Sequence, residues 1–127
     1  QAAFLGARLP MLDALNERRR QIIERYRAAA SGGPVEVLPA NGPHHVGHLA
    51  AALTSDRAAV RAALAARGVQ TDVHFPVPDH AQPGLPSHGE VLPVTEDIVD
   101  QVFSLPCFPE LTDDEVQQVC TAISELR

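Results

Sequence analysis

Apolar residues in the first thirty positions recur at steps of three and four residues, which is the spacing of a helix with one buried face. Pro10 lies inside this pattern and should kink or split the helix, because proline lacks a backbone donor and clashes with the preceding turn. Residues 31–34 read Ser-Gly-Gly-Pro, which is a stop signal. We therefore expect a long kinked helix over residues 1–30, with the apolar stripe Leu5, Leu9, Leu12, Leu15, Ile22, Tyr26 and Ala29.

Three later segments have the short, β-branched or alternating character of strands. The first covers residues 35–38, and the third covers residues 69–74. The second, residues 44–53, places every other side chain on one face, namely Val46, His48, Ala50 and Ala52. We therefore expect a small sheet of about three strands.

Helices are expected on both sides of the third strand. Ser55 can cap a helix over residues 56–67, because its hydroxyl can accept from a free N–H group of the first turn. Gly68 then offers the left-handed exit that favours glycine. Thr95, which two acidic residues follow, marks the start of a further helix that ends near residue 105.

The final helix has the clearest start signal. Thr112 and Glu115 have the spacing of a capping box, in which each side chain accepts from the backbone N–H of the other residue. The order of elements predicts an α+β domain with a small mixed or antiparallel sheet and helices packed on one side. The buried stripe of the final helix is Val116, Val119, Cys120, Ile123 and Leu126.

Composition narrows the classes of function. A chain of 127 residues has the size of one domain. A net charge of −6 with scattered arginines argues against nucleic acid, which requires a basic face. No apolar stretch reaches membrane-spanning length, and two cysteines without a CxxC pair indicate reduced thiols in the cytoplasm. The first residues show neither an initiator methionine nor a signal peptide, so we expect the interior of a longer chain.

Residues 75–92 form a loop rich in proline, glycine and histidine that is longer than a simple connection needs. His74 and His80 lie on either side of two prolines that stiffen the backbone between them, and Gln82 follows. A neutral imidazole can both donate and accept near pH 7, which suits it to orient a polar substrate or relay a proton. The alternative is that both histidines bond to nearby carbonyls and have no role in a site.

Other polar clusters give weaker hypotheses. His44 and His48 would lie about 13 Å apart on a strand, too far to share one metal ion. Residues 18–20 are consecutive arginines, which point about 100° apart on a helix and cannot form one phosphate-binding patch. Ser104 and Cys107 have no obvious base in the sequence, so nucleophilic catalysis has no support. We therefore expect no metal site and no catalytic nucleophile.

Taken in order, a set of short motifs points to one family. They are Gln1-Ala2-Ala3-Phe4-Leu5, Leu12-Asp13, Asn16, Arg19-Arg20, Tyr26, His45-Val46, His48-Leu49, Thr71, His74-Phe75-Pro76-Val77-Pro78, His80, Gln82-Pro83, Leu92-Pro93, Thr95-Glu96 and residues 104–116. Each piece is a weak signal, but their ordered sum is specific. The chain resembles the C-terminal part of the DegT/DnrJ/EryC1/StrS aminotransferases over essentially all of its length.

The resemblance implies the small domain of a fold-type-I enzyme that uses pyridoxal phosphate (PLP) to place amino groups on nucleotide-linked sugars and related cyclitols. Such enzymes are normally homodimers whose active sites are shared between subunits. Their large domain supplies the lysine that holds PLP, the carboxylate that pairs with its pyridine nitrogen, and most phosphate contacts. None of those segments is expected here, so no PLP should bind this chain alone.

The resemblance also assigns roles to residues of the loop. His80 matches a position that contacts the sugar substrate, and His74 and Gln82 match supports of that loop. Two departures concern substrate specificity. Gly47 stands where related sequences often have an aromatic residue, and residues 84–85 replace a small residue and a tyrosine.

The chain contains no lysine, and this absence limits what it can do alone. Schiff-base chemistry requires a primary amine, which arginine cannot replace because it stays protonated. We therefore expect the isolated chain to be inactive. Two alternatives stay open: the small domain of a PLP-dependent sugar dehydratase, and a stand-alone binding domain descended from the family.

Overall fold

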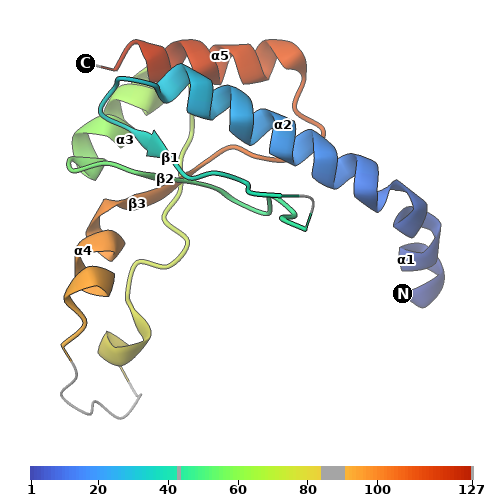
Figure 1. The fold of residues 1–127 in the computed structure, drawn as a ribbon, viewed down its shortest axis with the longest axis horizontal. Helices are drawn as coiled ribbons and strands as arrows, with labels where there is room; N and C mark the ends of the chain where they lie inside the picture. The colour runs from blue at the N-terminus through green and yellow to red at the C-terminus, as the bar shows by residue number, and fades with distance from the viewer. Residues whose placement is uncertain (43, 84–90, 127) are drawn as a thin grey trace.

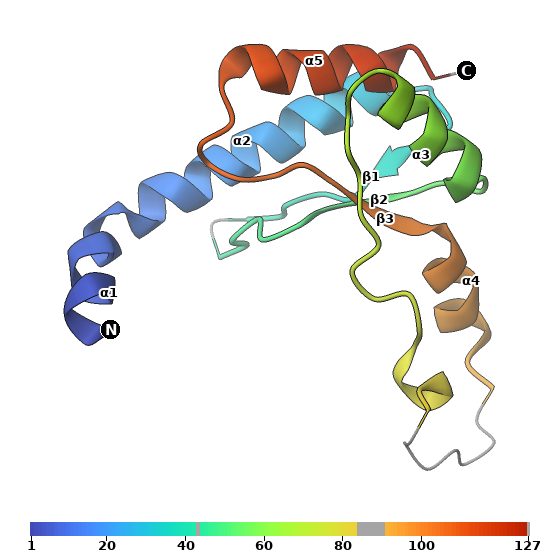
Figure 2. The same cartoon turned by 180° about the vertical axis from the view of Figure 1, so that it is seen from behind.

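The computed structural model of the protein describes residues 1–42, 44–83 and 91–126. Helix α2 (Leu12–Ala30) and helix α5 (Asp113–Ser124) lie side by side over one face of a three-stranded sheet (Figures 1 and 2). Helix α3 (Arg57–Ala66) buries Val60 and Leu64 in the same core. This arrangement confirms the expected α+β class, with helices packed on one side of a small sheet.

The first helix is interrupted at Pro10, as expected. Helix α1 (Ala2–Arg8) passes into the short 3-10 helix η1 (Leu9–Met11), in which Pro10 occupies the first turn, and α2 follows. The buried residues of this segment all belong to α2. The expected stripe is therefore wrong in its first half, where Leu5 and Leu9 are 65% and 66% exposed. Helix α1 extends beyond the sheet, which leaves these side chains without a surface to pack on (Figure 1).

The sheet is antiparallel throughout, in the order β1-β2-β3. Strand β1 (Glu36–Val37) pairs with β2 (Ala50–Leu53), and β2 pairs with β3 (Val102–Leu105). The register places Ala52 opposite both Val37 and Phe103. All three are buried on the face that α2 and α5 cover. The register therefore aligns buried side chains from all three strands in one row.

Three of the expected elements differ in the structure. The expected strand over residues 44–53 begins only at Ala50, and Gly47 before it has a φ of +61°, which breaks the extended conformation. Residues 69–74 form an isolated bridge between Asp72 and Ser104 and no strand. The helix expected to end near residue 105 ends at 101, and its last four residues are β3. Val-Phe-Ser-Leu gains more from pairing with β2 than from extending the helix.

Caps determine where the later helices begin. Asp56, and not Ser55 as expected, caps α3 by accepting from the N–H of Ala59 at 3.0 Å. The expected left-handed exit at Gly68 is confirmed by its φ of +77°. The capping box of α5 is also confirmed, because Thr112 and Glu115 bond to each other's backbone N–H groups.

Helix α4 (Pro93–Gln101) begins two residues before the expected start at Thr95. Together with the 3-10 helix η2 (Asp79–Ala81) it forms an arm that projects away from the sheet, on the side opposite α2 and α5 (Figures 1 and 2). Neither element has a buried residue. None of the helices in the described ranges is long and apolar enough to span a bilayer.

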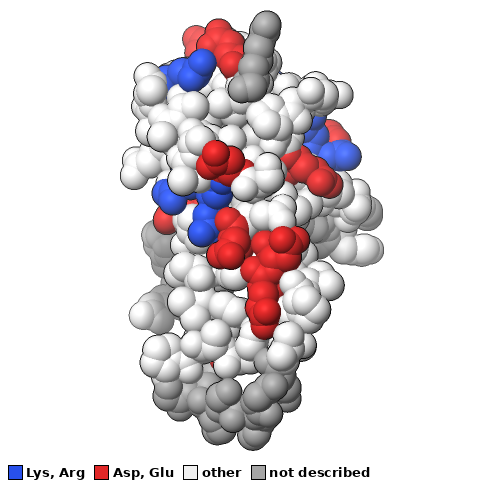
Figure 3. Space-filling view, turned by 90° about the vertical axis from the view of Figure 1, so that its left-hand side faces the viewer, with Lys and Arg blue, Asp and Glu red and all other residues white. Residues whose placement is uncertain are grey.

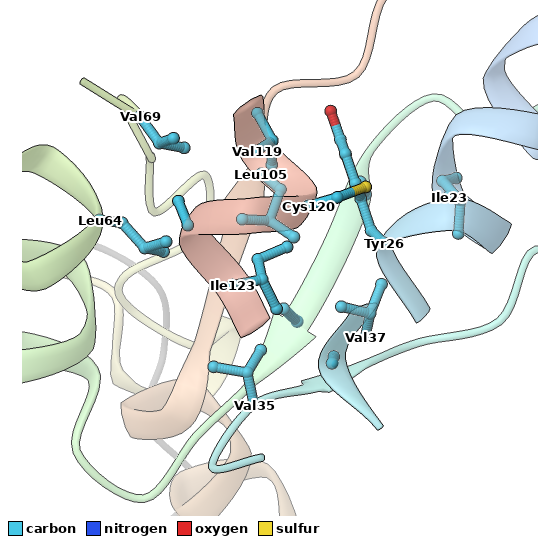
Figure 4. Packing of buried hydrophobic residues seen from close by; sticks show 14 of the residues in the cluster. Ile23, Tyr26, Val35, Val37, Leu64, Val69, Leu105, Val119, Cys120 and Ile123 are labelled. Atoms are coloured by element: carbon cyan, nitrogen blue, oxygen red, sulfur yellow. The ribbon is translucent and has the colours of Figure 1, made fainter. Parts of the chain in front are cut away.

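The core is formed by side chains from α2, α3, α5 and the sheet, which converge between the layers (Figure 4). Tyr26 is its largest fully buried residue, and its hydroxyl donates to the carbonyl of Pro106 at 3.0 Å. Desolvation of the hydroxyl raises the pKa of Tyr26, so it stays a neutral donor. Tyr26 therefore joins α2 to the segment after β3 by packing and by a hydrogen bond.

Candidate functional site

The arm holds His80 on a short, constrained turn. His80 is the central residue of η2, which Pro78 precedes at the N-cap. The N–H of Ala81 donates to the carbonyl of Pro78 at 3.0 Å, and the N–H of Gln82 donates to the carbonyl of Asp79 at 3.2 Å. Proline fixes its own φ, so these contacts give the His80 backbone a defined position.

The His80 ring is paired with a carboxylate from α4. Its Nε2 lies 3.2 Å from Oε1 of Glu96, and the side chain of His80 is only 15% exposed. The polar partner of the His80 ring is therefore a carboxylate and not a backbone carbonyl. A histidine held by a carboxylate has a fixed ring orientation, which a residue that orients a substrate requires.

Gln82 lies against the same turn. Its Nε2 is 3.5 Å from the carbonyl oxygen of Val77 and 3.5 Å from Oδ1 of Asp79. Both distances are long for hydrogen bonds, so the polar contacts of Gln82 with this turn are weak. The departure at residues 84–85, and the rest of the loop through residue 90, lie outside the described residues.

His74 is anchored to the sheet and not to the arm. Its Nδ1 is 3.1 Å from Oγ of the buried Ser104 in β3, while the backbones of Asp72 and Ser104 exchange hydrogen bonds of 3.1 and 2.8 Å. No base lies near Ser104 in the sequence, and folding places this imidazole beside it. Oδ1 of Asp72 accepts the N–H of Val73 at 2.8 Å, so these contacts describe a structural anchor and not a hydrolytic triad.

A groove of about 750 Å³ runs between the segment after α3 and the segment after β3. It brings His74 together with His48 and Cys107, and Arg61 lines one side. His80 and Gln82 are not among the described residues that line it. The three predicted site residues therefore divide between two places, with His74 in the groove and the other two on the arm.

The histidines and arginines of the first half behave as polar surface. No group of three His, Cys, Asp or Glu side chains within the described ranges could hold a metal ion. Arg18, Arg19 and Arg20 bond respectively to Asp113, Asn16 and Glu17, in three different directions. On the face shown in Figure 3, acidic side chains cover more surface than basic ones.

Cys107 is a half-buried thiol in the groove. Its Sγ donates weakly to the carbonyls of Gly47 and Arg19, at 3.6 and 3.9 Å. Burial raises the pKa of Cys107 from 9.0 to about 11, while the charge of Arg19 acts weakly in the opposite direction. Because the neutral form is favoured, Cys107 is a poor nucleophile at neutral pH.

This shift predicts slow alkylation. The test uses a Cys120→Ala variant at pH 8, in which Cys107 is the only thiol. Folded Cys107 should react with iodoacetamide about 100-fold more slowly than Cys107 in the urea-unfolded chain. The reason is that a rise in pKa from 9.0 to about 11 lowers the fraction of thiolate about 100-fold. The unfolded chain loses this proton first, so stability should fall as pH rises from 9 towards 11. Equal rates in the folded and unfolded chains would contradict the burial of Cys107.

Comparison with known proteins relates nearly the whole chain to one protein family. The profile of the DegT/DnrJ/EryC1/StrS aminotransferase family matches residues 1–124. A UDP-N-acetyl-3-dehydro-alpha-D-glucosamine 3-aminotransferase from Acidithiobacillus ferrooxidans is 34% identical over 97% of this chain and 34% of its own length. A dTDP-3-amino-3,4,6-trideoxy-alpha-D-glucose transaminase from Streptomyces venezuelae is 37% identical over 98% of this chain and 34% of its own length.

Solved structures agree in fold. DesV from S. venezuelae superposes with a TM-score of 0.86 at 36% identity, over 98% of this chain and 35% of that one. NtdA from Bacillus subtilis, solved with the cofactor PMP bound, superposes with a TM-score of 0.74 at 30% identity, over 87% of this chain and 28% of its own. The chain thus spans about a third of the length of these relatives. It belongs to the DegT/DnrJ/EryC1/StrS aminotransferase family.

Proposed function

We propose that residues 1–127 form the C-terminal small domain of a PLP-dependent aminotransferase that acts on a nucleotide-linked ketosugar or a related cyclitol. The observation that carries this proposal is the family match over residues 1–124, with relatives named as nucleotide-sugar transaminases. In this proposal residues 1–30 are the kinked helix that leads from a large domain, and residues 75–92 are the substrate loop. The free thiols of Cys107 and Cys120 suit a reducing cytoplasm.

The cofactor belongs to the large domain in this proposal. PLP supplies an electron sink for amino transfer when it is bound, and it requires a primary amine to attach it to the protein. This chain has no lysine, so its own side chains do not fit that requirement. In this proposal the domain contributes a surface that packs against the large domain and side chains that contact the substrate.

The surface that would meet the large domain is α1 with η1 and the start of α2. Its exposed apolar side chains are Phe4, Leu5, Leu9, Met11 and Leu12, each at least 45% exposed. A run of this kind is costly in water and is typical of an interface. The relatives are about three times longer than this chain. The partner proposed for this surface is a large domain that corresponds to the rest of their length. A homodimer with a shared active site is part of the same proposal.

The substrate contact is assigned to His80. Its ring is held by Glu96 on a turn stiffened by Pro78, with Gln82 as a brace. A ring with a fixed orientation can exchange a hydrogen bond with a sugar hydroxyl. His74 supports the base of the loop through its contact with Ser104.

The test compares the full-length enzyme with the isolated domain. With glutamate or glutamine as donor and a UDP- or dTDP-linked 3-ketosugar as acceptor, we expect amino sugar from the full-length protein and none from residues 1–127. His80→Ala in the full-length enzyme should lower kcat/KM about 10-fold, the size of one lost hydrogen bond. His44→Ala, an exposed histidine outside the loop, is the matched control.

Two outcomes would overturn the proposal. Turnover by the isolated domain would show that its lack of lysine does not matter. Loss of water from the sugar ring without amino transfer would identify a dehydratase instead.

A further inference from the structure

The carboxylate of Glu96 receives two hydrogen bonds at one oxygen. Its Oε1 lies 3.2 Å from Nε2 of His80 and 3.1 Å from the N–H of Leu92. A carboxylate oxygen has two lone pairs, so it can accept from both donors at once. Glu96 therefore links η2 to the start of α4.

The side chain of Glu96 is fixed by its own helix. The backbone N–H of Glu96 donates to the carbonyl of Leu92 at 2.9 Å, while its side chain accepts from the N–H of the same residue. This two-point attachment holds the carboxylate at the first turn of α4. The His80 ring thus meets an acceptor whose position is set before any ligand arrives.

This geometry dictates the tautomer of His80. An ionised carboxylate only accepts hydrogen bonds, so Nε2 of His80 must carry the proton. In the neutral ring Nδ1 is then the acceptor nitrogen. An imidazole without Glu96 would distribute its proton over both nitrogens.

We propose that Glu96 is a positioning residue that holds His80 as the Nε2–H tautomer, so that Nδ1 accepts a hydrogen bond from a hydroxyl group of the sugar substrate. This inference rests on the proposed function, because it needs His80 at the substrate. It adds a second residue to the site and a direction to the hydrogen bond. Glu96 acts through His80 and has no contact with the reacting atoms.

The tautomer is tested without activity, on the 127-residue chain, whose core lies within its own elements. Long-range proton–nitrogen NMR spectra of the neutral His80 ring should show the proton on Nε2. Glu96→Ala should raise the population of the Nδ1–H form, and Glu96→Gln should keep the wild-type ratio, because the amide oxygen can still accept from both donors. An equal ratio of the two tautomers in the wild-type chain and in Glu96→Ala would overturn the proposal.

Kinetics of the full-length enzyme test the role of the pair. Glu96→Ala should raise the KM for the nucleotide sugar about 10-fold with little change in kcat, because the contact with the hydroxyl serves binding. Glu96→Gln should stay within about 2-fold of the wild type. In a His80→Ala background, Glu96→Ala should have no further effect, since residues that act through one another are not additive.

Glu96 also caps α4, so a purely structural role needs its own control. Thr112→Ala removes comparable hydrogen bonds from the start of α5 and should lower the melting temperature without changing KM. Suppose that Glu96→Ala lowers stability and leaves KM unchanged, while His80→Ala raises KM. In that case the positioning role is wrong and the proposed function stands. If His80→Ala leaves KM unchanged, the assignment of His80 to the substrate fails, and the positioning role fails with it.

Discussion

Replacing Tyr26 with alanine should lower the free energy of unfolding by about 3–5 kcal/mol, the largest stability effect expected in this domain. Tyr26 is fully buried at 0% exposure, and its removal leaves a cavity between α2, α5 and the segment after β3. The carbonyl of Pro106 also loses its donor. Domains of this size are stable by about 5–15 kcal/mol, so the variant should lose a large fraction of its stability. Urea titration followed by circular dichroism measures the loss.

Tyr26→Phe separates the two contributions. It keeps the ring and removes only the hydroxyl, so we expect a cost of about 1–2 kcal/mol from the unpaired carbonyl. A loss of less than about 1 kcal/mol for Tyr26→Ala would mean that the ring is not part of the core.

Gly47→Ala is expected to be the second most damaging substitution, at about 2–5 kcal/mol, because two penalties add. Gly47 has a φ of +61°, which costs a residue with a Cβ about 1–2 kcal/mol. The new Cβ would also lie 2.9 Å from Cβ of Arg19 and 3.4 Å from Cδ1 of Ile23. Either α2 or the loop must therefore shift. The unfolding free energy, measured as for Tyr26, tests this.

Gly32→Ala is the matched control, because Gly32 has a φ of +76° and a Cβ there would meet nothing within 4 Å. It carries the backbone penalty alone, about 1–2 kcal/mol. The difference between the two variants measures the crowding against Arg19. Equal losses would show that Gly47 is needed for its backbone conformation only. The aromatic residue expected in related sequences at this position could not follow the same backbone path here.

The helices were predictable where sequence signals are local. Pro10 and the pair Thr112 and Glu115 act on their own turn of helix, and both signals appear in the structure as expected. Strands were less predictable, because their stability depends on a partner that is distant in sequence. Residues 102–105 continue a helical pattern and become β3 only because β2 offers them a pairing edge.

The candidate site shows the same division. The loop with His80 could be identified from composition and from the resemblance. Its partner Glu96 could not, since the two residues are 16 positions apart and meet only when α4 folds back along the arm. Similarly, His74 and Ser104 are separated by 30 positions and are joined by the bridge between Asp72 and β3. The sequence alone does not indicate which polar residues form such long-range pairs.

The buried core and the proposed contact surfaces occupy different parts of this molecule. The elements α1, η1, η2 and α4 have no buried residue, while α2, α3, α5, the strands and four residues in the adjoining segments supply the described core. Substitutions on the two protrusions can therefore accumulate without disturbing the interior. Surface residues of these elements could therefore change during evolution while the interior of the fold stays the same.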